Sequence, residues 1–260
     1  MQCRVIRADP SGNITLFVLD PVDAAGRPAL AERLMRRMGP DIEQVGFACP
    51  AREGAEGRLE MSGGEFCGNA TRAFGTFLAK QAKLNGQVQI RVEASGCDRI
   101  VRVDADLERG TARAEMPLPR LVRQIDLDGI CGTLVHLGGI AHLVLEEIDP
   151  SESVLERAEP VFTSFPGLDA YGVIFLNDGK MTPLVKVPAA HTLFWEGSCG
   201  SGTVAAAVAQ SEELADGAFV RTYEQPAGSV EATVIRQNGS VIAAYIGGSV
   251  RFGEIETVEV

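Results

Sequence analysis

The stretch 64-GEFCGNATRAFG-75 places a cysteine directly before Gly-Asn, at what the sequence predicts to be the start of a helix. Far downstream, 196-EGSCGSGTVAAA-207 repeats this order, with Cys-Gly followed by a small polar residue, a small residue and threonine. Cys67 and Cys199 lie about half the chain apart, and each precedes a run with helical spacing. The repetition predicts two similar halves, each with a cysteine at the N-terminus of a helix.

The composition limits the class of protein. The 260 residues are 45% hydrophobic and 23% charged, which predicts a packed core in one large domain or two ordinary ones. The net charge of −11 argues against nucleic acid as a partner. The longest apolar runs are too short to span a membrane, and the first residues lack the apolar region of a signal peptide. We therefore expect a soluble, cytoplasmic protein.

The six cysteines are scattered, and no CxxC motif occurs. The spacing therefore indicates neither a zinc site nor a thioredoxin-type motif. A long chain without a signal peptide does not favour disulfides. We interpret four of the cysteines as small buried hydrophobic residues: Cys3, Cys49, Cys97 and Cys131.

Strand-like runs recur along the chain and are separated by turn signals such as Asn238-Gly239. Clear helical patterns are fewer, and they fall at 28–38, 69–83 and 201–214. The helix after Cys199 is small and apolar nearly all round, which is typical of a buried helix. Many strands with few helices predict an α+β fold, in which a β-barrel-like sheet wraps around a central helix.

A cysteine at a helix N-terminus is more acidic than a free one, because unpaired N–H groups and the helix dipole favour the thiolate. If the two halves face each other, a thiolate and a thiol would flank one small ligand. One would remove a proton next to a carboxylate, and the other would supply a proton from the opposite face. The N–H groups that would bind the carboxylate belong to Gly68, Asn69, Gly200 and Ser201.

Other interpretations of the two cysteines stay open. They could form a redox pair, since thiols close enough for two-base chemistry are also close enough for a disulfide. The protein would then be a non-catalytic amino-acid binding or redox-sensing protein. A nucleophilic Cys/His site is less favoured, because neither His142 nor His191 forms a local motif with a cysteine.

At the two motifs FCGNATR and SCGSGT the chain resembles the diaminopimelate epimerase-like superfamily of cofactor-independent amino-acid racemases and epimerases. The segment 9-DPSGNITLFVLD-20 is similar to the opening Gly-Asn segment of the family, which makes Asn13 a substrate-binding candidate. The segment 138-GGIAHLVL-145 retains the histidine of a further family motif, His142. The landmarks occur in order over the whole chain.

The resemblance implies two pseudo-symmetric halves, each a β-barrel around a central helix, with the active site in the cleft between them. It implies that Cys67 and Cys199 are the two bases and that neither pyridoxal phosphate nor a metal is needed. In the family the last strand returns to the first half. We therefore predict one half from 1–117 plus 249–260 and the other from 118–248.

Departures from diaminopimelate epimerases concern the residues that hold the far carboxylate of their substrate. An asparagine is replaced by Ile140, and a Glu-Arg pair is missing before Cys199. Aromatic and acidic groups stand near the second motif instead, and they suit an imidazole better than a carboxylate. The pattern is similar to histidine racemases of staphylopine-type metallophore biosynthesis, in which D-histidine feeds an opine-type metal chelator. The aromatic and acidic groups near the second motif are Tyr171, Phe194, Trp195 and Glu196.

We therefore expect a small-molecule amino-acid substrate, with L-histidine first. Diaminopimelate, proline-type imino acids and other amino acids are the alternatives. Glu65 and Glu196 each lie close to a cysteine and would tune its pKa or bind the substrate amine, and Trp195 is a further substrate-binding candidate. We expect no nucleic-acid or membrane partner, and a homodimer is left open.

Overall fold

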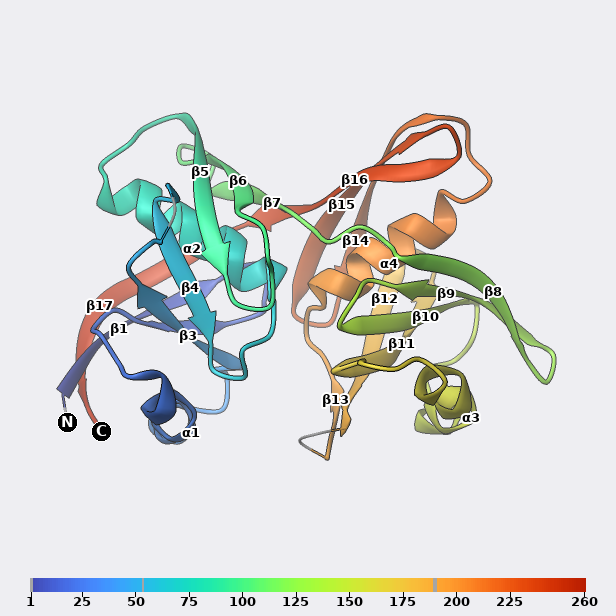
Figure 1. Cartoon of the computed structure of the whole chain (residues 1–260), viewed down its shortest axis with the longest axis horizontal. Coiled ribbons are helices and arrows are strands. Elements are labelled where there is room, and N and C mark those ends of the chain that lie inside the picture. Colours follow the sequence, from blue (N-terminus) through green and yellow to red (C-terminus); the bar gives the residue numbers. More distant parts are fainter. Residues whose placement is uncertain (1, 53, 189–190) are drawn as a thin grey trace. The chain divides into compact units, whose positions relative to one another are not determined.

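The computed structural model describes residues 2–52, 54–188 and 191–260, which form two compact units. One unit combines Met1–Glu115 with Gly247–Val260, and the other is Met116–Ile246. Each unit combines many strands with two described α-helices (Figure 1), so the predicted α+β class is confirmed.

The first unit contains the strands β1 (Gln2–Asp9), β2 (Thr15–Val18), β3 (Gln44–Cys49), β4 (Gly57–Met61), β5 (Gln87–Ala94), β6 (Val101–Asp106), β7 (Thr111–Glu115) and β17 (Arg251–Glu259). Neighbours pair in the order β17-β1-β2-β3-β4-β5-β6-β7. The β2–β3 and β4–β5 pairs are parallel, and the others are antiparallel. The β1–β17 pair therefore holds the two ends of the chain together.

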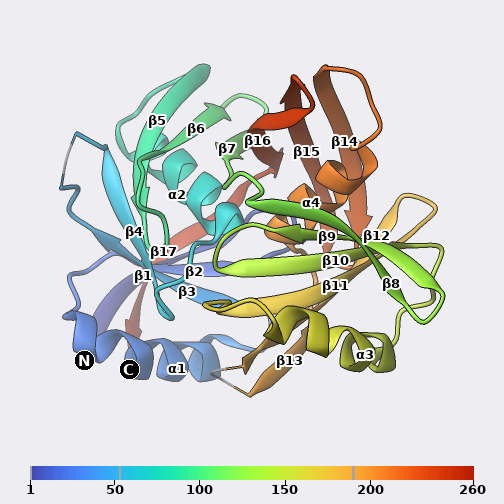
Figure 2. The same ribbon diagram turned by 45° about the vertical axis from the view of Figure 1, so that its right-hand side comes forward.

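The two α-helices of this unit pack into different apolar clusters. The helix α2 (Gly68–Gln81) packs Phe74 and Phe77 among strand residues that include Val92 and Val103. The helix α1 (Arg27–Met38) follows a short 3-10 turn, η1 (Ala24–Gly26), and packs its own apolar side on β2 and β3. Figure 2 shows α2 among β4–β7, and α1 apart from it beside β3. The helix that begins after Cys67 is thus held inside the first unit, as its apolar side chains require.

The second unit contains the strands β8 (Leu121–Leu127), β9 (Ile130–His136), β10 (Ile140–Glu146), β11 (Ala170–Asn177), β12 (Lys180–Val187), β13 (Thr192–Trp195), β14 (Gly217–Gln225), β15 (Gly228–Gln237) and β16 (Ser240–Ser249). The last residues of β16 belong to the first unit. The β10–β11 pair is parallel, and the hairpins β8–β9 and β14–β15 are antiparallel. These strands are the frame on which the second cysteine motif is built.

The helix α4 (Gly200–Gln210) contacts β15 and β10, and its small residues Ala205, Ala206 and Ala207 are fully buried. The helix α3 (Glu152–Thr163) packs Leu155 and Phe162 with β10 and β11 in a separate cluster. Figure 2 shows α3 beside β11. Small side chains let α4 lie close to the strands around it. Within the described residues, no helix has the length and apolarity needed to cross a membrane.

The structure differs from the sequence prediction at several elements. The three predicted helices are present, but α3 was not predicted, because Pro160 lies inside its apolar pattern. Ser151 starts α3 by accepting a hydrogen bond from the Ser153 N–H (3.3 Å). Six described strands also lie outside the predicted strand-like runs: β3, β4, β8, β13, β14 and β17. A glycine interrupts the apolar run of β3, and most residues of β17 are exposed.

Gly96 tests how tightly the loop before Cys67 is held. Its φ is +66°, and an added Cβ would overlap the backbone nitrogen of Phe66. Gly86 has the same φ but open space around it. We expect Gly86→Ala to lower the free energy of unfolding by about 1–2 kcal/mol through its backbone conformation. Gly96→Ala should cost roughly 1–3 kcal/mol more because of the overlap.

Urea unfolding of both variants measures this difference. Equal losses of stability in the two variants would mean that the loop before Cys67 yields freely to the added methyl group.

Candidate active site

Cys67 is the N-cap residue of α2. Its backbone is extended (φ −121°, ψ 110°), and its sulfur accepts a hydrogen bond from the Ala70 N–H at 3.4 Å. The Thr71 hydroxyl donates to the Cys67 carbonyl at 2.7 Å, which closes the first turn of the helix. The sulfur therefore lies at the positive end of the helix dipole, where negative charge is stabilised.

The side chains of Gln44 and Asn13 lie at the Cys67 sulfur. The Gln44 side-chain amide donates to it at 3.2 Å, and also lies 2.6 Å from the Asn13 side-chain oxygen. That Asn13 oxygen is 3.8 Å from the sulfur, and the Asn13 amide donates to Glu43 at 2.6 Å. Asn13 thus lies beside Cys67, and Gln44 adds an N–H donor that the sequence analysis did not identify.

The other predicted residues near Cys67 differ in exposure. Asn69 is buried, and its side-chain oxygen accepts a hydrogen bond from the Arg72 Nε at 3.2 Å. Its side chain is therefore held by the helix, while Gly68 and Asn69 lie in the first turn, where backbone N–H groups have no partner within the helix. Glu65 is exposed, two residues before Cys67.

Cys199 starts α4 with nearly the same geometry (φ −113°, ψ 108°). Its sulfur accepts a hydrogen bond from the Gly202 N–H at 3.3 Å, and the Thr203 hydroxyl donates to its carbonyl at 2.6 Å. Gln225, the last residue of β14, accepts from the Cys199 N–H at 2.7 Å and donates to the Thr203 hydroxyl at 2.9 Å. The two cysteines therefore have the same local structure, and a different glutamine supports each of them.

The surroundings of Cys199 favour its neutral thiol. Burial raises the pKa of the Cys199 thiol well above its usual value, and the negative charge of Glu196 and a hydrogen bond to it raise that pKa further. Hydrogen bonds with Ser201 and the Gly202 N–H act in the opposite direction. Glu196 is thus a direct neighbour of the second cysteine. Such proximity is required for the predicted role of tuning the thiol pKa.

His142 and Ser201 form a polar pair inside the second unit. The Ser201 hydroxyl lies 2.8 Å from the His142 Nε2 and 3.5 Å from the Cys199 sulfur. His142 is fully buried on β10, and burial lowers its pKa to about 3, so the ring is neutral at neutral pH. Its Nδ1 has no hydrogen-bond partner among the described residues. His142 and Ser201 therefore both belong to the surroundings of Cys199.

The aromatic residues near the second motif lie in two different environments. Trp195 is 44% exposed, its indole N–H donates to Glu152 at 3.3 Å, and its ring lies 6.2 Å from that of Phe175. Tyr171 is buried, stacks on Phe162 at 4.8 Å and has its hydroxyl on the Glu159 carboxylate. Tyr171 is therefore part of the core under α3, whereas the exposed Trp195 remains accessible.

The glutamines were missed because no local signal marks them. Gln44 lies opposite Thr15 in the β2–β3 pair, and Gln225 is at the end of a hairpin strand. Both are more than twenty residues from the cysteine that they support. Only the strand pairing of each unit brings them there.

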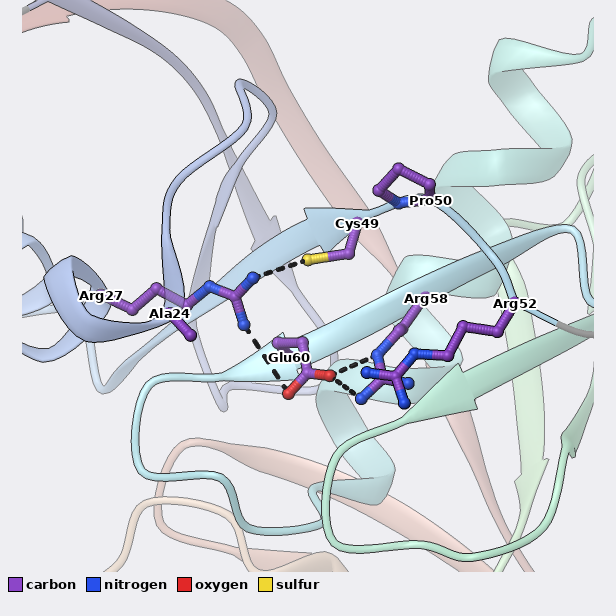
Figure 3. Close-up of a pocket in the computed structure, with 7 residues that line it drawn as sticks. All are labelled: Ala24, Arg27, Cys49, Pro50, Arg52, Arg58 and Glu60. Carbon is purple, nitrogen blue, oxygen red and sulfur yellow. Dashed lines mark hydrogen bonds and ion pairs between the residues drawn. The ribbon is translucent and has the colours of Figure 1, made fainter.

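A cavity of about 420 Å³ in the first unit lies away from these residues. Among the residues that line it, Glu60 forms ion pairs with both Arg27 and Arg58, and the Arg27 guanidinium also donates to the Cys49 sulfur (Figure 3). None of the predicted site residues lines it. The residues that line it are Ala24, Arg27, Cys49, Pro50, Arg52, Arg58 and Glu60.

In the described part of the chain, no group of three or more His, Cys, Asp or Glu side chains is placed to hold a metal ion. What each unit offers is one thiol at a helix N-terminus, with backbone N–H donors beside it. A thiol with such donors beside it has the chemistry to bind an anion and to exchange a proton.

Comparisons with known proteins give one consistent result. The family model described as "Histidine racemase CntK N-terminal domain" matches residues 2–254. A histidine racemase of Fusobacterium nucleatum subsp. nucleatum is 31% identical over 212 residues, which are 77% of this chain and 78% of that protein. A histidine racemase of Staphylococcus aureus is 29% identical over 244 residues, 86% of each chain.

Among solved structures, a probable proline racemase from Agrobacterium radiobacter is similar, with a TM-score of 0.69 and 14% sequence identity. The match covers 100% of this chain and 93% of that one. At this identity the likeness concerns the fold alone.

The buried His142 predicts a specific acid sensitivity. The unfolded chain protonates this histidine below about pH 6.5, whereas the folded protein keeps it neutral down to about pH 3. Stability is therefore lost as the pH falls between these values, by about 1.4 kcal/mol per pH unit from this group. The stability advantage of the wild type over His142→Asn should shrink at that rate.

Urea unfolding of both proteins at several acidic pH values measures the advantage. His191→Asn, at an exposed histidine, is the matched control. An advantage that stays constant between neutral pH and pH ~4 would contradict the prediction.

Proposed function

Because the chain belongs to the histidine racemase family, and is thus an isomerase, we propose that it interconverts L- and D-histidine by two-base proton transfer between Cys67 and Cys199. One cysteine acts as thiolate and removes the α-proton, and the other acts as thiol and protonates the opposite face. The observation that carries the proposal is that each sulfur caps the helix that follows it and accepts a first-turn N–H.

The helix N-terminus is what makes a thiol useful for this chemistry. An α-proton is a weak acid, so the base that removes it must be unprotonated when the substrate binds and able to take up the proton during turnover. The helix dipole and the N–H donor stabilise the thiolate at each cysteine. The proposal requires both sulfurs to reach one α-carbon from opposite faces during the reaction.

The α-carboxylate of the substrate would bind to the first-turn N–H groups. These groups belong to the residues directly after each cysteine, and they carry the positive end of each helix dipole. Charge builds up on the carboxylate as the α-proton leaves, so these donors stabilise the transition state more than the ground state. The residues assigned to this role are Gly68, Asn69, Gly200 and Ser201.

For the side chain of the substrate we propose contacts with acidic and aromatic groups. Glu196 lies beside Cys199, and a carboxylate there can accept a hydrogen bond from an imidazole N–H or from the substrate amine. Trp195 offers an exposed aromatic face. Asn13 and His142 would orient groups at the first and second cysteine, respectively, and Glu65 would contribute from the loop before Cys67.

Several broader expectations belong to the same proposal. The two units would be the pseudo-symmetric halves of a diaminopimelate epimerase-like fold. The product D-histidine would feed an opine-type metal chelator, and the enzyme would work in the cytoplasm without pyridoxal phosphate or metal. Association as a homodimer is a further expectation, and light scattering of the purified protein tests it.

Proton exchange at the α-carbon tests the function directly. The reduced enzyme with L-histidine in D2O should remove the α-proton NMR signal, and chiral chromatography of the same sample should detect D-histidine. Cys67→Ala and Cys199→Ala should each lower the rate by about 10²–10⁴-fold, because each removes one partner of the proton transfer.

Cys97→Ala and Cys131→Ala are the matched controls, since both cysteines lie outside the two motifs. Full activity of either Cys67→Ala or Cys199→Ala would exclude the two-base mechanism. If histidine is not exchanged, diaminopimelate, proline and the other amino acids are tested in the same way. Binding without exchange of any of them would support a non-catalytic binding or redox-sensing protein.

Gln44 supplies the side-chain N–H nearest to the Cys67 sulfur. Gln44→Leu removes a donor to a charged sulfur, which is worth about 1.5–3 kcal/mol, or a decrease in kcat of roughly tenfold to a hundredfold. Gln89→Leu is the control, because that amide is exposed on β5 and donates to Asp104, not to a cysteine. The loss is measured by the exchange assay, and equal rates for the two variants would remove Gln44 from the mechanism.

A further inference from the structure

Arg72 is a fully buried cation in α2, on the fifth position after Cys67. Its three nitrogens donate to neutral acceptors: the Asn69 side-chain oxygen (3.2 Å), the Ser249 carbonyl (3.0 Å) and the Ser11 hydroxyl (3.0 Å). In the described residues it forms no ion pair with a carboxylate within 4.0 Å. Burying a cation without a counter-ion is costly, so its positive charge needs a partner.

The second unit provides an internal comparison. Its cysteine also caps a helix, its Thr203 repeats the bond made by Thr71, and the fifth position after Cys199 is also fully buried. That position holds Val204 instead of an arginine. Two otherwise matched helix starts thus differ by one buried positive charge.

The other charged groups around the two cysteines are mainly acidic. On the first side, Asp9 faces Arg72, but Asp9 is also paired with Arg251 at 2.8 Å. Glu43 and Glu65 also lie on this side, and burial raises the pKa of each carboxyl, which disfavours its negative charge. On the second side, Glu196 hydrogen-bonds the Cys199 thiol, and the nearby His142 is neutral and contributes no positive charge.

We propose that Arg72 is a positioning residue that keeps Cys67 as the resting thiolate, while Cys199 rests as the neutral thiol. This inference rests on the proposed function, since it assigns resting roles to the two thiols of that reaction. The charge of the buried guanidinium interacts with the Cys67 sulfur. The second helix has Val204 at the matching position and offers no such charge to Cys199. The guanidinium also holds Asn69 in place and ties the Ser11 turn to the Ser249 carbonyl.

The assignment gives a balanced proton path. The Cys67 thiolate takes the α-proton of the enantiomer whose C–H bond faces it, and the Cys199 S–H protonates the α-carbon from the other side. After turnover Cys67 is a thiol and Cys199 a thiolate. One proton then leaves Cys67 for solvent and one is taken up by Cys199, which restores the resting state.

Alkylation of the two cysteines measures the resting state. The reduced enzyme is treated with iodoacetamide from about pH 5 to about pH 10, and each cysteine is followed by peptide mass spectrometry. Exposure sets the plateau rate at each sulfur, whereas ionisation sets the pH at which the rate reaches half of that plateau. We expect the thiolate fraction at neutral pH to be at least roughly tenfold higher at Cys67 than at Cys199.

Variants of Arg72 identify the source of this difference. Arg72→Met should lower the thiolate fraction of Cys67 at neutral pH by roughly tenfold, whereas Arg72→Lys should retain it because it keeps the charge. Ser11→Ala is the control, since it removes a hydrogen bond of Arg72 and leaves the charge in place. Circular dichroism establishes that each variant is folded.

An unchanged Cys67 profile in folded Arg72→Met would overturn the role of Arg72. If that variant does not fold, the inference is judged by the order in which the two cysteines of the wild type ionise as the pH rises. Ionisation of Cys199 before Cys67 overturns it. Deuterium exchange with histidine does not depend on which thiol rests as thiolate. If histidine exchanges its α-proton but Cys199 ionises before Cys67, this inference alone is rejected. If Cys67 ionises first but no exchange occurs, the racemase function alone is rejected.

Discussion

The first N–H groups of a buried helix need acceptors, and in both units one of these acceptors is a cysteine sulfur. Much of the surrounding structure serves this contact. The threonine four residues on closes the same turn through the cysteine carbonyl, and strands enclose the apolar remainder of the helix. At this position the backbone N–H donor and the helix dipole favour the thiolate form of the sulfur.

Repetition of the helix start does not make the two sulfurs equivalent. Glutamine side chains support both, but Gln44 donates to the sulfur of Cys67, whereas Gln225 binds the backbone of Cys199. The first helix continues with a buried arginine and the second with a buried valine. Glu196 adds negative charge at the second cysteine. The two similar helix starts thus have unlike electrostatic surroundings. This difference suits the proposed reaction, which needs a base and an acid at the same moment.

Much of this site could be predicted from sequence because helix-start chemistry is local. Cysteine, glycine and the following threonine lie within five residues, so the motifs alone predict both N-caps and both helices. Gln44 and Gln225 could not be found in this way, because strand pairing brings them to the cysteines from distant positions. Trp195 illustrates the same limit. Its indole N–H binds Glu152 of α3, a helix whose pattern is interrupted by Pro160 and was not predicted. Tyr171, grouped with Trp195 by sequence, is buried under that helix.

The pairing of β1 with β17 has a consequence for how the chain is synthesised. The ribosome produces the second unit as one continuous segment, so every strand of Met116–Ile246 has been translated before the last residues of the first unit exist. Until then β1 lacks its neighbour on one edge, and Arg72 lacks the Ser249 carbonyl that it binds. Domains usually fold in the order of translation. Here the first unit cannot be completed before the second has been translated, because its last strand follows the second unit in the chain.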